Sequence, residues 1–537
     1  MEPDVANILK QTNFSTLDWG IVVAYLVVSV VVGLMVKKYV KNMADYVTAG
    51  RGVGAALGVA TLTGTEMGLV TIMYSAEKGF NSGFAAFHMA AIAGIVTFFV
   101  GLTGFFIYRL RQMEVLTIPE YYERRFGRRT RILGGIMLTF GGVLNMGLFL
   151  RVGSQFIVGV TGMSAEGWPL PTVMTVLLAL VLLYTVLGGM VSVIITDYLQ
   201  FVVLSFGVLI VTGLCILNLG WDNIFNTIAA EMGEKGFDPL DPAGGFGVEY
   251  VLWMLFTAGL VGSALWPTAV ARALAADSPQ TVKKQFMWCS VSYLIRFMIP
   301  YVWGISAFVF IMTKAPDLKE VFFPSAQGAK GMPSLLAMPV VLGRIVPAGL
   351  LGVLTAAMIA AFMSTHDSYL LCWSSVITQD IVAPLMGGRL SARARITLTR
   401  VLILLIGGYI LYWGLIYEGK EDIWDYMAVS GAIYFTGAFA LLVCGLYWKR
   451  ASSTGAVLAL LCGLLAILGL GPVRKGLGLD GLLAAAAEGL GLKPTGERIT
   501  AWIGLGTIIL AVAAMIVGSL LFPDKRPAGA AEAEGEG

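Results

Sequence analysis

Three hydroxyls and one carboxylate lie close together in the apolar stretch AFMSTHDSYLL, residues 361–371. Ser364, Thr365, Asp367 and Ser368 occur at spacings of one, three and four residues, which place them on one side of a helix. Hydroxyl and carboxylate oxygens can replace the hydration shell of a small hard cation. A charged group inside a membrane is costly and marks an ion or substrate path. The stretch therefore indicates a cation site, provided that the chain spans a membrane.

The composition indicates a membrane protein. The chain has 537 residues, of which 57% are hydrophobic and 13% charged, whereas soluble domains carry about 25% charged residues. The net charge of +3 is small and no basic block is present, so we expect no nucleic-acid partner. The five cysteines lie in apolar runs without CxxC spacing, which predicts buried small side chains and neither disulfides nor a zinc site.

Thirteen apolar runs are long enough to cross a bilayer, at about 20 residues per span. Numbered as helices 0 to 12, they lie near 17–36, 53–78, 82–108, 130–160, 172–188, 191–218, 250–271, 286–312, 346–374, 398–417, 423–447, 454–472 and 499–522. Acidic residues precede the first run, which predicts a retained membrane anchor and not a cleavable signal peptide.

The lysines and arginines are distributed unequally over the predicted loops. Most of the 36 fall on one set of alternate loops and flanks, among them Arg272 after helix 6, and the positive-inside rule places that set in the cytoplasm. Residues 1–16 are then extracellular, and the polar tail 523–537 is cytoplasmic and predicted to be disordered. The long loops 219–249, 313–345 and 473–498 face outside, where we expect short surface helices. We predict a multi-pass protein of the cell membrane.

Two of the spans look interrupted. Helix 1 carries Gly64 and Gly68 among polar residues that include Glu66, and helix 6 carries Gly262 followed by Trp266-Pro267. Breaks at matching positions of two halves are typical of inverted-repeat transporters, whose sites lie where the helices unwind. Glycines that merely allow close helix packing are the alternative.

Six motifs in sequence order resemble those of the sodium/solute symporter family, which transports sugars, proline, pantothenate, sialic acid and monocarboxylates. They are DYVTAGR at 45–51, TIPEYYERRFG at 117–127, GGMVSVIITDYLQ at 188–200, RALAADS at 272–278, MSTHDSYLLCWSSVITQDI at 363–381 and GLYWKRASSTGA at 445–456. The likeness extends over about residues 17–460. It implies an all-α integral membrane protein of about 13 transmembrane helices, with one transporter domain over 17–522.

The implied architecture is a LeuT-like five-plus-five inverted repeat, over about 53–218 and 250–447. An additional N-terminal helix precedes the repeats, and helices 1 and 6 are discontinuous. The resemblance also implies a main sodium site between helix 8 and the break in helix 1. Its ligands would be the hydroxyls of Ser364 and Thr365 and the carbonyl oxygens of Val59, Leu62 and Ala361. Back-bonding of the hydroxyls to the preceding helical turn is the alternative role.

Some members of the family have a second sodium site, formed by an aspartate of helix 5 and further positions of helix 8. In this sequence these residues are Asp197, Asp367 and Ser368, together with Ser364. Two neighbouring carboxylates would strengthen cation binding or share a proton. Alternatively, Asp197 pairs with an arginine near the entrance of helix 5, and Asp367 pairs with His366 or an arginine.

Other polar and aromatic residues in the spans are candidates for a solute site. They are Thr65, Glu66, His88, Arg151, Trp266 and Arg296. Arg151 is similar in position to the arginine that sialic-acid transporters of the family place on the substrate carboxylate, and a guanidinium binds carboxylates bidentately. Glu66 could hold an ammonium group or hydroxyls, or pair with Arg151. Arg296 could form a structural ion pair, and Trp266 could be a pocket floor or simple packing.

The charges in the spans add to these expectations. Glu66, Asp197 and Asp367 outnumber Arg151 and Arg296 by one, a deficit of positive charge that one or two sodium ions would offset. We therefore predict a secondary active transporter in which sodium flow drives uptake of a small organic solute, such as a carboxylate or a zwitterion held between Arg151 and Glu66.

Several alternatives remain open from the sequence. They are a neutral sugar as the solute, proton coupling through Glu66, Asp197 or Asp367, and a sensor or channel of the same fold. No catalytic motif indicates an enzyme. The expected cofactor is the sodium ion, the expected partners are the solute and the lipid bilayer, and the expected functional unit is a monomer.

Overall fold

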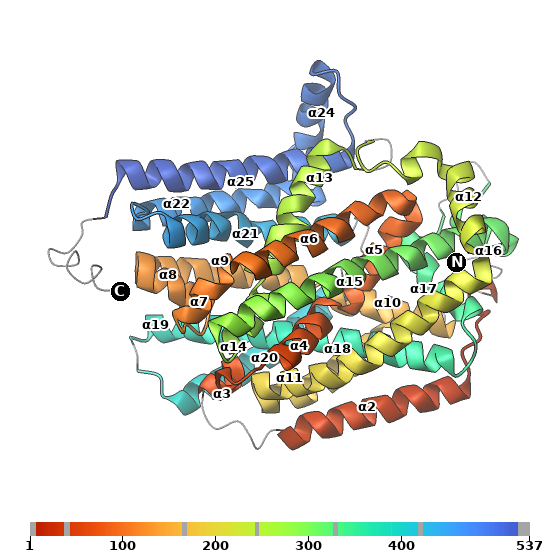
Figure 1. The fold of residues 1–537 in the computed structure, drawn as a ribbon, viewed down its shortest axis with the longest axis horizontal. Helices are drawn as coiled ribbons and strands as arrows, with labels where there is room; N and C mark the ends of the chain where they lie inside the picture. The colour runs from red at the N-terminus through yellow and green to blue at the C-terminus, as the bar shows by residue number, and fades with distance from the viewer. Residues whose placement is uncertain are drawn as a thin grey trace.

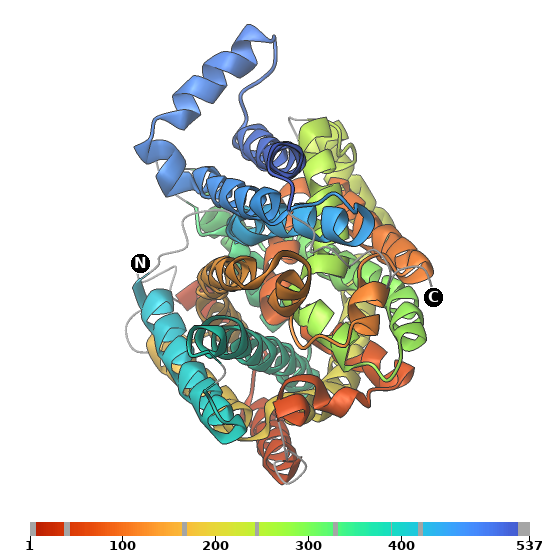
Figure 2. The same ribbon diagram turned by 90° about the vertical axis from the view of Figure 1, so that its left-hand side faces the viewer.

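The computed structural model describes residues 7–36, 43–163, 169–241, 246–325, 331–387, 389–416 and 423–524. Within these ranges the regular elements are all helices. Most of them run in similar directions (Figure 1), and a view turned by 90° shows many of them nearly end-on, packed into one bundle (Figure 2). An all-helical class is what the apolar runs of the sequence predicted.

Long helices alternate with short ones in both halves of the chain. The first half contains α2 (Thr16–Val36), α3 (Met43–Thr48), α4 (Ala55–Glu66), α5 (Leu69–Ser82), α6 (Phe87–Thr103), α7 (Ile107–Gln112), α8 (Ile118–Phe126), α9 (Arg128–Met146), α10 (Phe149–Thr161), α11 (Pro169–Leu219) and α12 (Trp221–Met232). The second half contains α13 (Val248–Met254), the π-helix η6 (Leu255–Leu265), α14 (Pro267–Ala275), α15 (Pro279–Thr313), α16 (Pro316–Phe322), α17 (Ala337–Ile345), α18 (Leu350–Val376), the π-helix η8 (Ile377–Val382), α19 (Ala383–Leu385), α20 (Ala392–Ile416), α21 (Ile423–Tyr447), α22 (Ser453–Gly463), the 3-10 helix η9 (Leu464–Gly469), α23 (Gly471–Gly476), α24 (Leu479–Gly489) and α25 (Gly496–Leu521).

Eleven segments of the described residues are long and apolar enough to cross a membrane, so the chain is a multi-pass membrane protein. The sequence predicted thirteen spans. The predicted run 53–78 differs because it is divided into α4, which has only 12 residues, and α5. A turn at Gly83, whose φ is 58°, separates α5 from α6, which lies in the predicted run 82–108. The run 454–472 differs because α22 ends after 11 residues and continues as the short η9. The exact number of spans stays a prediction.

Helices 1 and 6 are broken where the sequence predicted discontinuous helices. In helix 1, α4 ends at Glu66 and α5 begins at Leu69, with Gly68 in an extended conformation between them. In helix 6, η6 ends before Trp266, which is extended, and α14 begins at Pro267. Proline suits the first position of a helix because that position needs no N–H donor. The short connection predicted between the spans 172–188 and 191–218 is a kink within α11 at Gly189, whose φ is 55°.

The long loops contain the short helices that the sequence predicted. The helix α12 lies in the loop after α11, the helices α16 and α17 follow α15, and α24 extends away from the bundle before α25 (Figure 1). Most of the predicted disordered tail lies outside the described residues, which end at 524.

The N-terminal helix α2 is bound to the start of α18, the helix that carries residues 364–368. The Asp18 Oδ1 atom accepts hydrogen bonds from the backbone N–H groups of Gly349 (2.7 Å) and Gly352 (2.5 Å), and its Oδ2 atom accepts from Ser15. The first N–H groups of a helix have no partner within it, and a carboxylate is favoured there. Asp18 therefore caps α18 from another helix.

We predict that Asp18→Ala lowers the stability of the protein by about 1–2 kcal/mol, because two N–H groups at the start of α18 lose their acceptor. Asp18→Asn should lose less, since an amide oxygen can still accept. The apparent melting temperature of the purified protein measures the effect. Asp222, an exposed acid in the first turn of α12, provides the control substitution Asp222→Ala. Equal melting temperatures for the two alanine variants would contradict the capping role.

Candidate functional site

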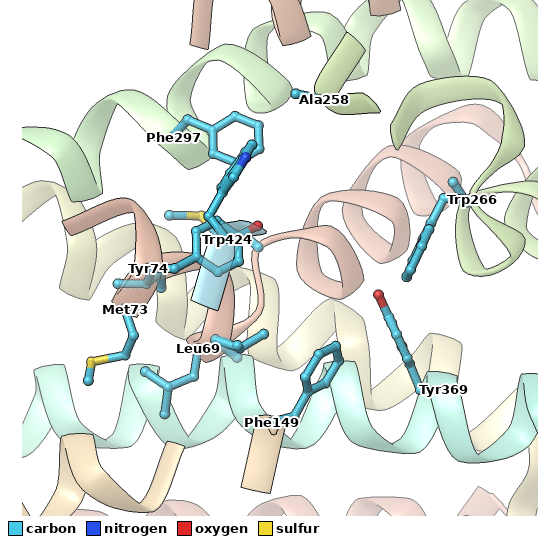
Figure 3. Packing of buried hydrophobic residues seen from close by; sticks show 14 of the residues in the cluster. Leu69, Met73, Tyr74, Phe149, Ala258, Trp266, Phe297, Tyr369 and Trp424 are labelled. Atoms are coloured by element: carbon cyan, nitrogen blue, oxygen red, sulfur yellow. The ribbon is translucent and has the colours of Figure 1, made fainter. Parts of the chain in front are cut away.

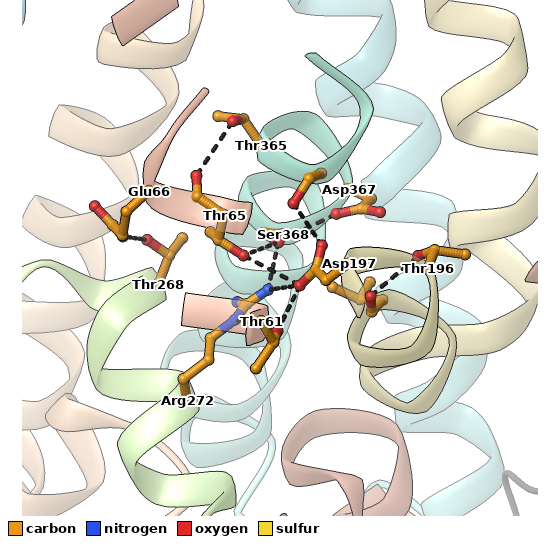
Figure 4. A network of polar contacts seen from close by, with 12 residues as sticks. Thr61, Thr65, Glu66, Thr196, Asp197, Thr268, Arg272, Thr365, Asp367 and Ser368 are labelled. Carbon is orange, nitrogen blue, oxygen red and sulfur yellow. Dashed lines mark hydrogen bonds and ion pairs between the residues drawn. The ribbon is translucent and has the colours of Figure 1, made fainter. Parts of the chain in front are cut away.

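The polar residues of α18 meet Asp197 of α11 in the interior of the bundle (Figure 4). Asp197 is fully buried, and its Oδ1 atom accepts a hydrogen bond from Ser364 (2.5 Å). Its Oδ2 atom accepts from Thr61 (2.5 Å) and Thr65 (3.2 Å), both of α4. The structure thus joins the helix before the break in helix 1 to helices 5 and 8 through one carboxylate.

Arg272 of α14 belongs to the same cluster, which the sequence did not predict. Its Nη2 atom donates to Asp197 Oδ2 (3.1 Å) and to Ser368 Oγ (2.5 Å). The sequence placed Arg272 on a cytoplasmic flank, but the residue is only 1% exposed. The arginine follows an apolar run directly, and its side chain extends from α14 into the bundle. Pairing of Asp197 with an arginine, one of the two alternatives, is therefore observed.

Asp367 is linked to Asp197 indirectly, through Ser368 and Arg272. Ser368 donates to Asp367 Oδ1 (3.1 Å), and Tyr184 of α11 donates to Asp367 Oδ2 (2.7 Å). His366 is not its partner, since the His366 Nδ1 atom contacts the Phe362 carbonyl (2.8 Å). The predicted residues of the second cation site are therefore brought together.

The charge of this cluster is unbalanced. Two buried carboxylates, Asp197 and Asp367, face a single guanidinium, whose Nη1 atom has no hydrogen-bond partner among the described residues. Buried charges need compensation, and with both acids ionised the cluster carries one net negative charge. The sequence predicted three acids and two arginines in the spans, and Arg272 is a third arginine that balances this count. The missing positive charge is therefore a property of this cluster and not of the spans as a whole.

The residues of the predicted main sodium site are only partly brought together. The Thr365 hydroxyl donates to the carbonyl oxygens of Ala361 (3.0 Å) and Thr65 (3.2 Å), so it connects α18 to the end of α4. The Val59 carbonyl contacts the Cys289 thiol of α15 (3.8 Å), and Leu62 lies inside α4, before the break. The Thr65 carbonyl is an additional oxygen that the sequence did not single out. Carbonyl and hydroxyl oxygens suit a sodium ion.

A cavity of about 100 Å³ lies beside the break in helix 1. Four predicted solute residues line it, namely Thr65, Glu66, Trp266 and Arg296. The other residues of its wall are Val70, Thr71, Tyr74, Asn145, Thr257, Ala258, Val261, Gly262, Phe297, Thr365, Tyr369, Trp424, Met427, Ala428 and Phe435. The cavity is therefore walled by α4, α5, η6, α15, α18 and α21, with a contribution from α9.

Glu66 and Arg296 form an ion pair in the wall of this cavity. The Arg296 Nη1 atom donates to Glu66 Oε2 (2.9 Å), and Thr268 donates to Glu66 Oε1 (2.9 Å). The guanidinium carbon lies 4.1 Å and 4.5 Å from the ring centroids of Tyr293 and Phe297. Among the described residues, neither its Nε atom nor its Nη2 atom makes a hydrogen bond. One edge of a firmly held guanidinium thus remains available.

Aromatic rings form two groups around the break in helix 1 (Figure 3). Tyr74, Trp424 and Phe297 form one group, in which the Tyr74 and Trp424 centroids are 4.7 Å apart. Trp266 and Tyr369 belong to the other, at 5.6 Å. The sequence pointed only to Trp266, because the other rings lie in spans where aromatic residues are ordinary core residues.

Asn145 of α9 is a further polar residue of the wall that the sequence did not single out. Its Nδ2 atom donates to Met427 and Ser430 of α21, whereas its Oδ1 atom is buried without a partner among the described residues. A buried acceptor without a donor is unfavourable, so it can receive a hydrogen bond from a bound molecule.

Two of the predicted solute residues lie elsewhere. Arg151 of α10 donates to the Gly414 carbonyl of α20 (3.0 Å). His88 of α6 contacts the Ala85 carbonyl (2.6 Å), and its ring packs on Phe246. Neither residue lines the cavity. Glu66 pairs with Arg296 and not with Arg151. The rotation of each helix about its axis determines which arginine side chain points into the cavity.

Thr65 and Glu66, the last two residues of α4, connect the cation cluster to the cavity. The Thr65 hydroxyl contacts Asp197 and Ser368, and its carbonyl accepts from Thr365. The next side chain, Glu66, holds Arg296 in the cavity wall. A movement of the break would therefore displace residues of both the cation cluster and the cavity wall.

Two broken helices, with a polar cluster and a cavity at the breaks, define a membrane transporter of the inverted-repeat type. A model of the sodium:solute symporter family matches residues 46–463, well over half of the chain. The chain belongs to the sodium:solute symporter family, and its function is sodium-coupled uptake of a solute.

Similar proteins agree with this family. The sodium/glucose cotransporter of Vibrio parahaemolyticus is 24% identical over 490 residues, covering 84% of both chains. The sodium/sialic acid symporter SiaT of Proteus mirabilis is 25% identical over 477 residues, covering 85% of this chain and 90% of that protein. Among solved structures, a substrate-bound, outward-open Na⁺-coupled sialic acid symporter matches with a TM-score of 0.77 at 19% identity, covering 96% of this chain and 100% of that one. The fold class predicted from the sequence is thereby confirmed.

We predict that Gly68→Ala weakens the dependence of the protein on sodium, because a Cβ at this position would lie 2.2 Å from Thr365 Oγ1. Forcing these groups apart should reduce the apparent sodium affinity about tenfold. Thermal stabilisation of the purified protein by increasing sodium concentrations measures this affinity. Gly213→Ala is the control, since a Cβ there meets no atom within 4 Å. An unchanged sodium affinity for Gly68→Ala would show that the contact between helices 1 and 8 is not needed.

Proposed function

We propose that this symporter takes up a small organic carboxylate, which it binds in the cavity beside the break in helix 1. The observation that carries the proposal is the free edge of the Arg296 guanidinium. Nε and Nη2 lie on one edge of the guanidinium plane, and two parallel N–H donors match the two oxygens of a carboxylate. The Nη2 atom lies 3.5 Å from the position of a Cβ on Gly262, a residue of the same cavity wall.

The surroundings of Arg296 favour a carboxylate over a zwitterion. Glu66 accepts from both Arg296 and Thr268, so its negative charge is already compensated and no uncompensated acid of the described residues lines the cavity to hold an ammonium group. This changes the hypothesis drawn from the sequence, in which Arg151 and Glu66 held the two charges. The carboxylate partner becomes Arg296.

The cavity wall also bears on the rest of the solute. Six aromatic residues line it, namely Tyr74, Trp266, Phe297, Tyr369, Trp424 and Phe435. Aromatic faces favour an apolar or flat body, whereas a sugar needs a polar partner for each hydroxyl. We therefore propose a small carboxylate with an apolar body, and we assign one of its polar contacts to Asn145 Oδ1. A neutral sugar is the second candidate, because relatives of the chain are named as sodium/glucose and sodium/mannose cotransporters.

We assign one sodium ion to the interface of α18 with the break in helix 1. Its proposed ligands are the hydroxyls of Ser364 and Thr365 and the carbonyl oxygens of Ala361, Val59 and Leu62, to which the Thr65 carbonyl is added. Sodium binding there would order the end of α4 and, through Glu66, the orientation of Arg296. Sodium binding and solute binding would then favour the same conformation of the break. This is the requirement for coupling sodium flow to solute uptake.

We assign a second monovalent cation to Asp197, Asp367 and Ser368. The single net negative charge of this cluster supports the assignment, because one cation would balance it. Hydroxyl groups surround the two carboxylates and direct hydrogen bonds to them or to each other; they belong to Ser364, Thr61, Thr65, Ser368 and Tyr184. Rotation of these hydroxyls would turn oxygen lone pairs toward the cation.

Sodium would enter from the side on which we place the N-terminus and the loops after α11, α15 and α23. Each charge moving across the membrane releases about 2.3 kcal/mol per 100 mV, in addition to the concentration term. Alternating access would move helices 1 and 6, with their neighbours α6 and α15, relative to α18 and α11. The described residues suggest no covalent step, and the protein would work as a carrier.

We expect Arg296→Lys to lower the affinity for the solute about ten- to a hundredfold, because lysine keeps the charge opposite Glu66 but loses the bidentate edge. Thermal stabilisation is to be measured with acetate, propionate, benzoate, sialic acid and glucose, each with and without sodium. The best carboxylate of this screen is then used for uptake into proteoliposomes. Arg151→Lys is the matched control and should bind the solute as the unchanged protein does.

Each outcome of the screen decides between the candidates. Stabilisation by glucose alone would replace the carboxylate with a sugar. A loss of solute affinity in Arg151→Lys and not in Arg296→Lys would show that Arg151, and not Arg296, binds the carboxylate. Uptake that persists without sodium and follows an imposed pH gradient would replace sodium with a proton.

We predict that Asp367→Asn reduces the number of cations carried per solute from two to one, because the neutral amide removes the uncompensated charge of the cluster. Reversal of the solute flux at graded sodium gradients and membrane potentials in proteoliposomes measures this number. Asp222→Asn, on the exposed face of α12, is the control. A coupling number that stays the same in Asp367→Asn would contradict the second site.

A further inference from the structure

A second pocket, of about 320 Å³, lies at the arginine-rich end of the bundle, away from the solute site. It is formed where α9, η8, α19 and the start of α20 meet. Its lining residues are Glu123, Arg128, Arg131, Gln379, Ala383, Pro384, Gly387 and Arg395. Neither the sodium site nor the solute cavity uses any of them.

The charges of this pocket are incompletely paired. Arg131 contacts Glu123, and its Nε atom donates to the buried Asp380 (2.9 Å). Arg128 donates to the Pro384 carbonyl, but neither Arg128 nor Arg395 forms an ion pair with any of the described residues. Three guanidinium groups therefore face two carboxylates, which leaves one net positive charge.

The hydrogen-bond donors of the pocket are also incompletely paired. Gln379 is 3% exposed, and its Oε1 atom accepts from Arg395 Nη1 (3.1 Å). This contact fixes the carboxamide, since the amide nitrogen cannot face a guanidinium. The Gln379 Nε2 group and the Arg395 Nε group are then buried donors without partners among the described residues. Buried donors in native proteins have partners, so these two groups indicate a bound acceptor.

We propose that this pocket binds the phosphate of an anionic phospholipid. A phosphodiester carries the single negative charge that the pocket lacks, and its oxygens can accept from arginine and amide donors at once. A membrane lipid is the source because the pocket lies at the end of the bundle that we place in the cytoplasm, and α20 next to it has a largely exposed apolar surface. Basic pockets between transmembrane helices at this level hold lipid headgroups in other proteins.

The positive-inside rule alone does not account for these features. That rule requires arginines in cytoplasmic loops, which exposed residues such as Arg129 satisfy. It does not require buried donors without acceptors on two different helices. A phosphate bound between Arg128 of α9 and Arg395 of α20 would connect both helices to η8, the continuation of the sodium-binding helix.

The test compares the full-length protein with the double variant Arg128→Gln/Arg395→Gln. Native mass spectrometry of protein extracted from phosphatidylglycerol and from phosphatidylcholine membranes counts the lipids retained. We expect one tightly held phosphatidylglycerol in the unchanged protein, at least tenfold weaker retention in the double variant, and no difference for phosphatidylcholine. Arg129→Gln, next to Arg128 and exposed, removes the same kind of charge and should retain the lipid.

Equal loss of phosphatidylglycerol in Arg129→Gln would reduce the effect to general surface charge and overturn the proposal. Inorganic phosphate that stabilises lipid-free protein and displaces phosphatidylglycerol at millimolar concentration would reassign the pocket to free phosphate, which also overturns it. Thermal stabilisation by sodium checks that the variants are folded, and Arg395→Lys provides a milder variant if the double one is not. The measurement does not involve solute uptake, so its outcome is independent of the Arg296 experiments.

Discussion

The close approach of α18 to the break in helix 1 is the constraint on which the rest of the site depends. A side chain at Gly68 would overlap Thr365, so the chain must carry glycine there. The Thr365 hydroxyl then reaches the Thr65 carbonyl. Because α4 ends at this point, its last two side chains face different neighbours. Thr65 contacts the Asp197 cluster, and Glu66 contacts Arg296 in the cavity wall. One contact between two helices thus sets the geometry of both the proposed cation site and the proposed solute site.

Much of the fold could be predicted from the sequence because its signals are local. Glycines among polar residues and a Trp-Pro pair marked both broken helices, and the length of the apolar runs marked the spans. The span count was harder to predict, because length and hydropathy do not show that α4 has only 12 residues or that α22 ends after 11. These ends depend on packing against neighbouring helices.

The site was predictable where several polar residues share one helical face, as on α18. It was not predictable where a single charged residue lies in an apolar run. Arg151 and Arg296 look alike in the sequence, and only the rotation of their helices decides which one reaches the cavity. Arg272 was counted as a loop residue because charge statistics consider position along the chain, whereas its side chain extends into the bundle to meet Asp197. Aromatic wall residues carried no signal, since the core of any helical bundle contains such rings.

The cap that Asp18 places on α18 has a consequence for the biogenesis of the protein. The two partners are separated by 331 residues, so the carboxylate is synthesised long before the N–H groups that it binds. At about 5–20 residues per second the ribosome needs roughly 15 to 65 s to reach Gly349. During that time the N-terminal helix must wait in the membrane without its partner on α18. The contact of α2 with α18 therefore forms late in assembly, only after α18 has been synthesised and inserted.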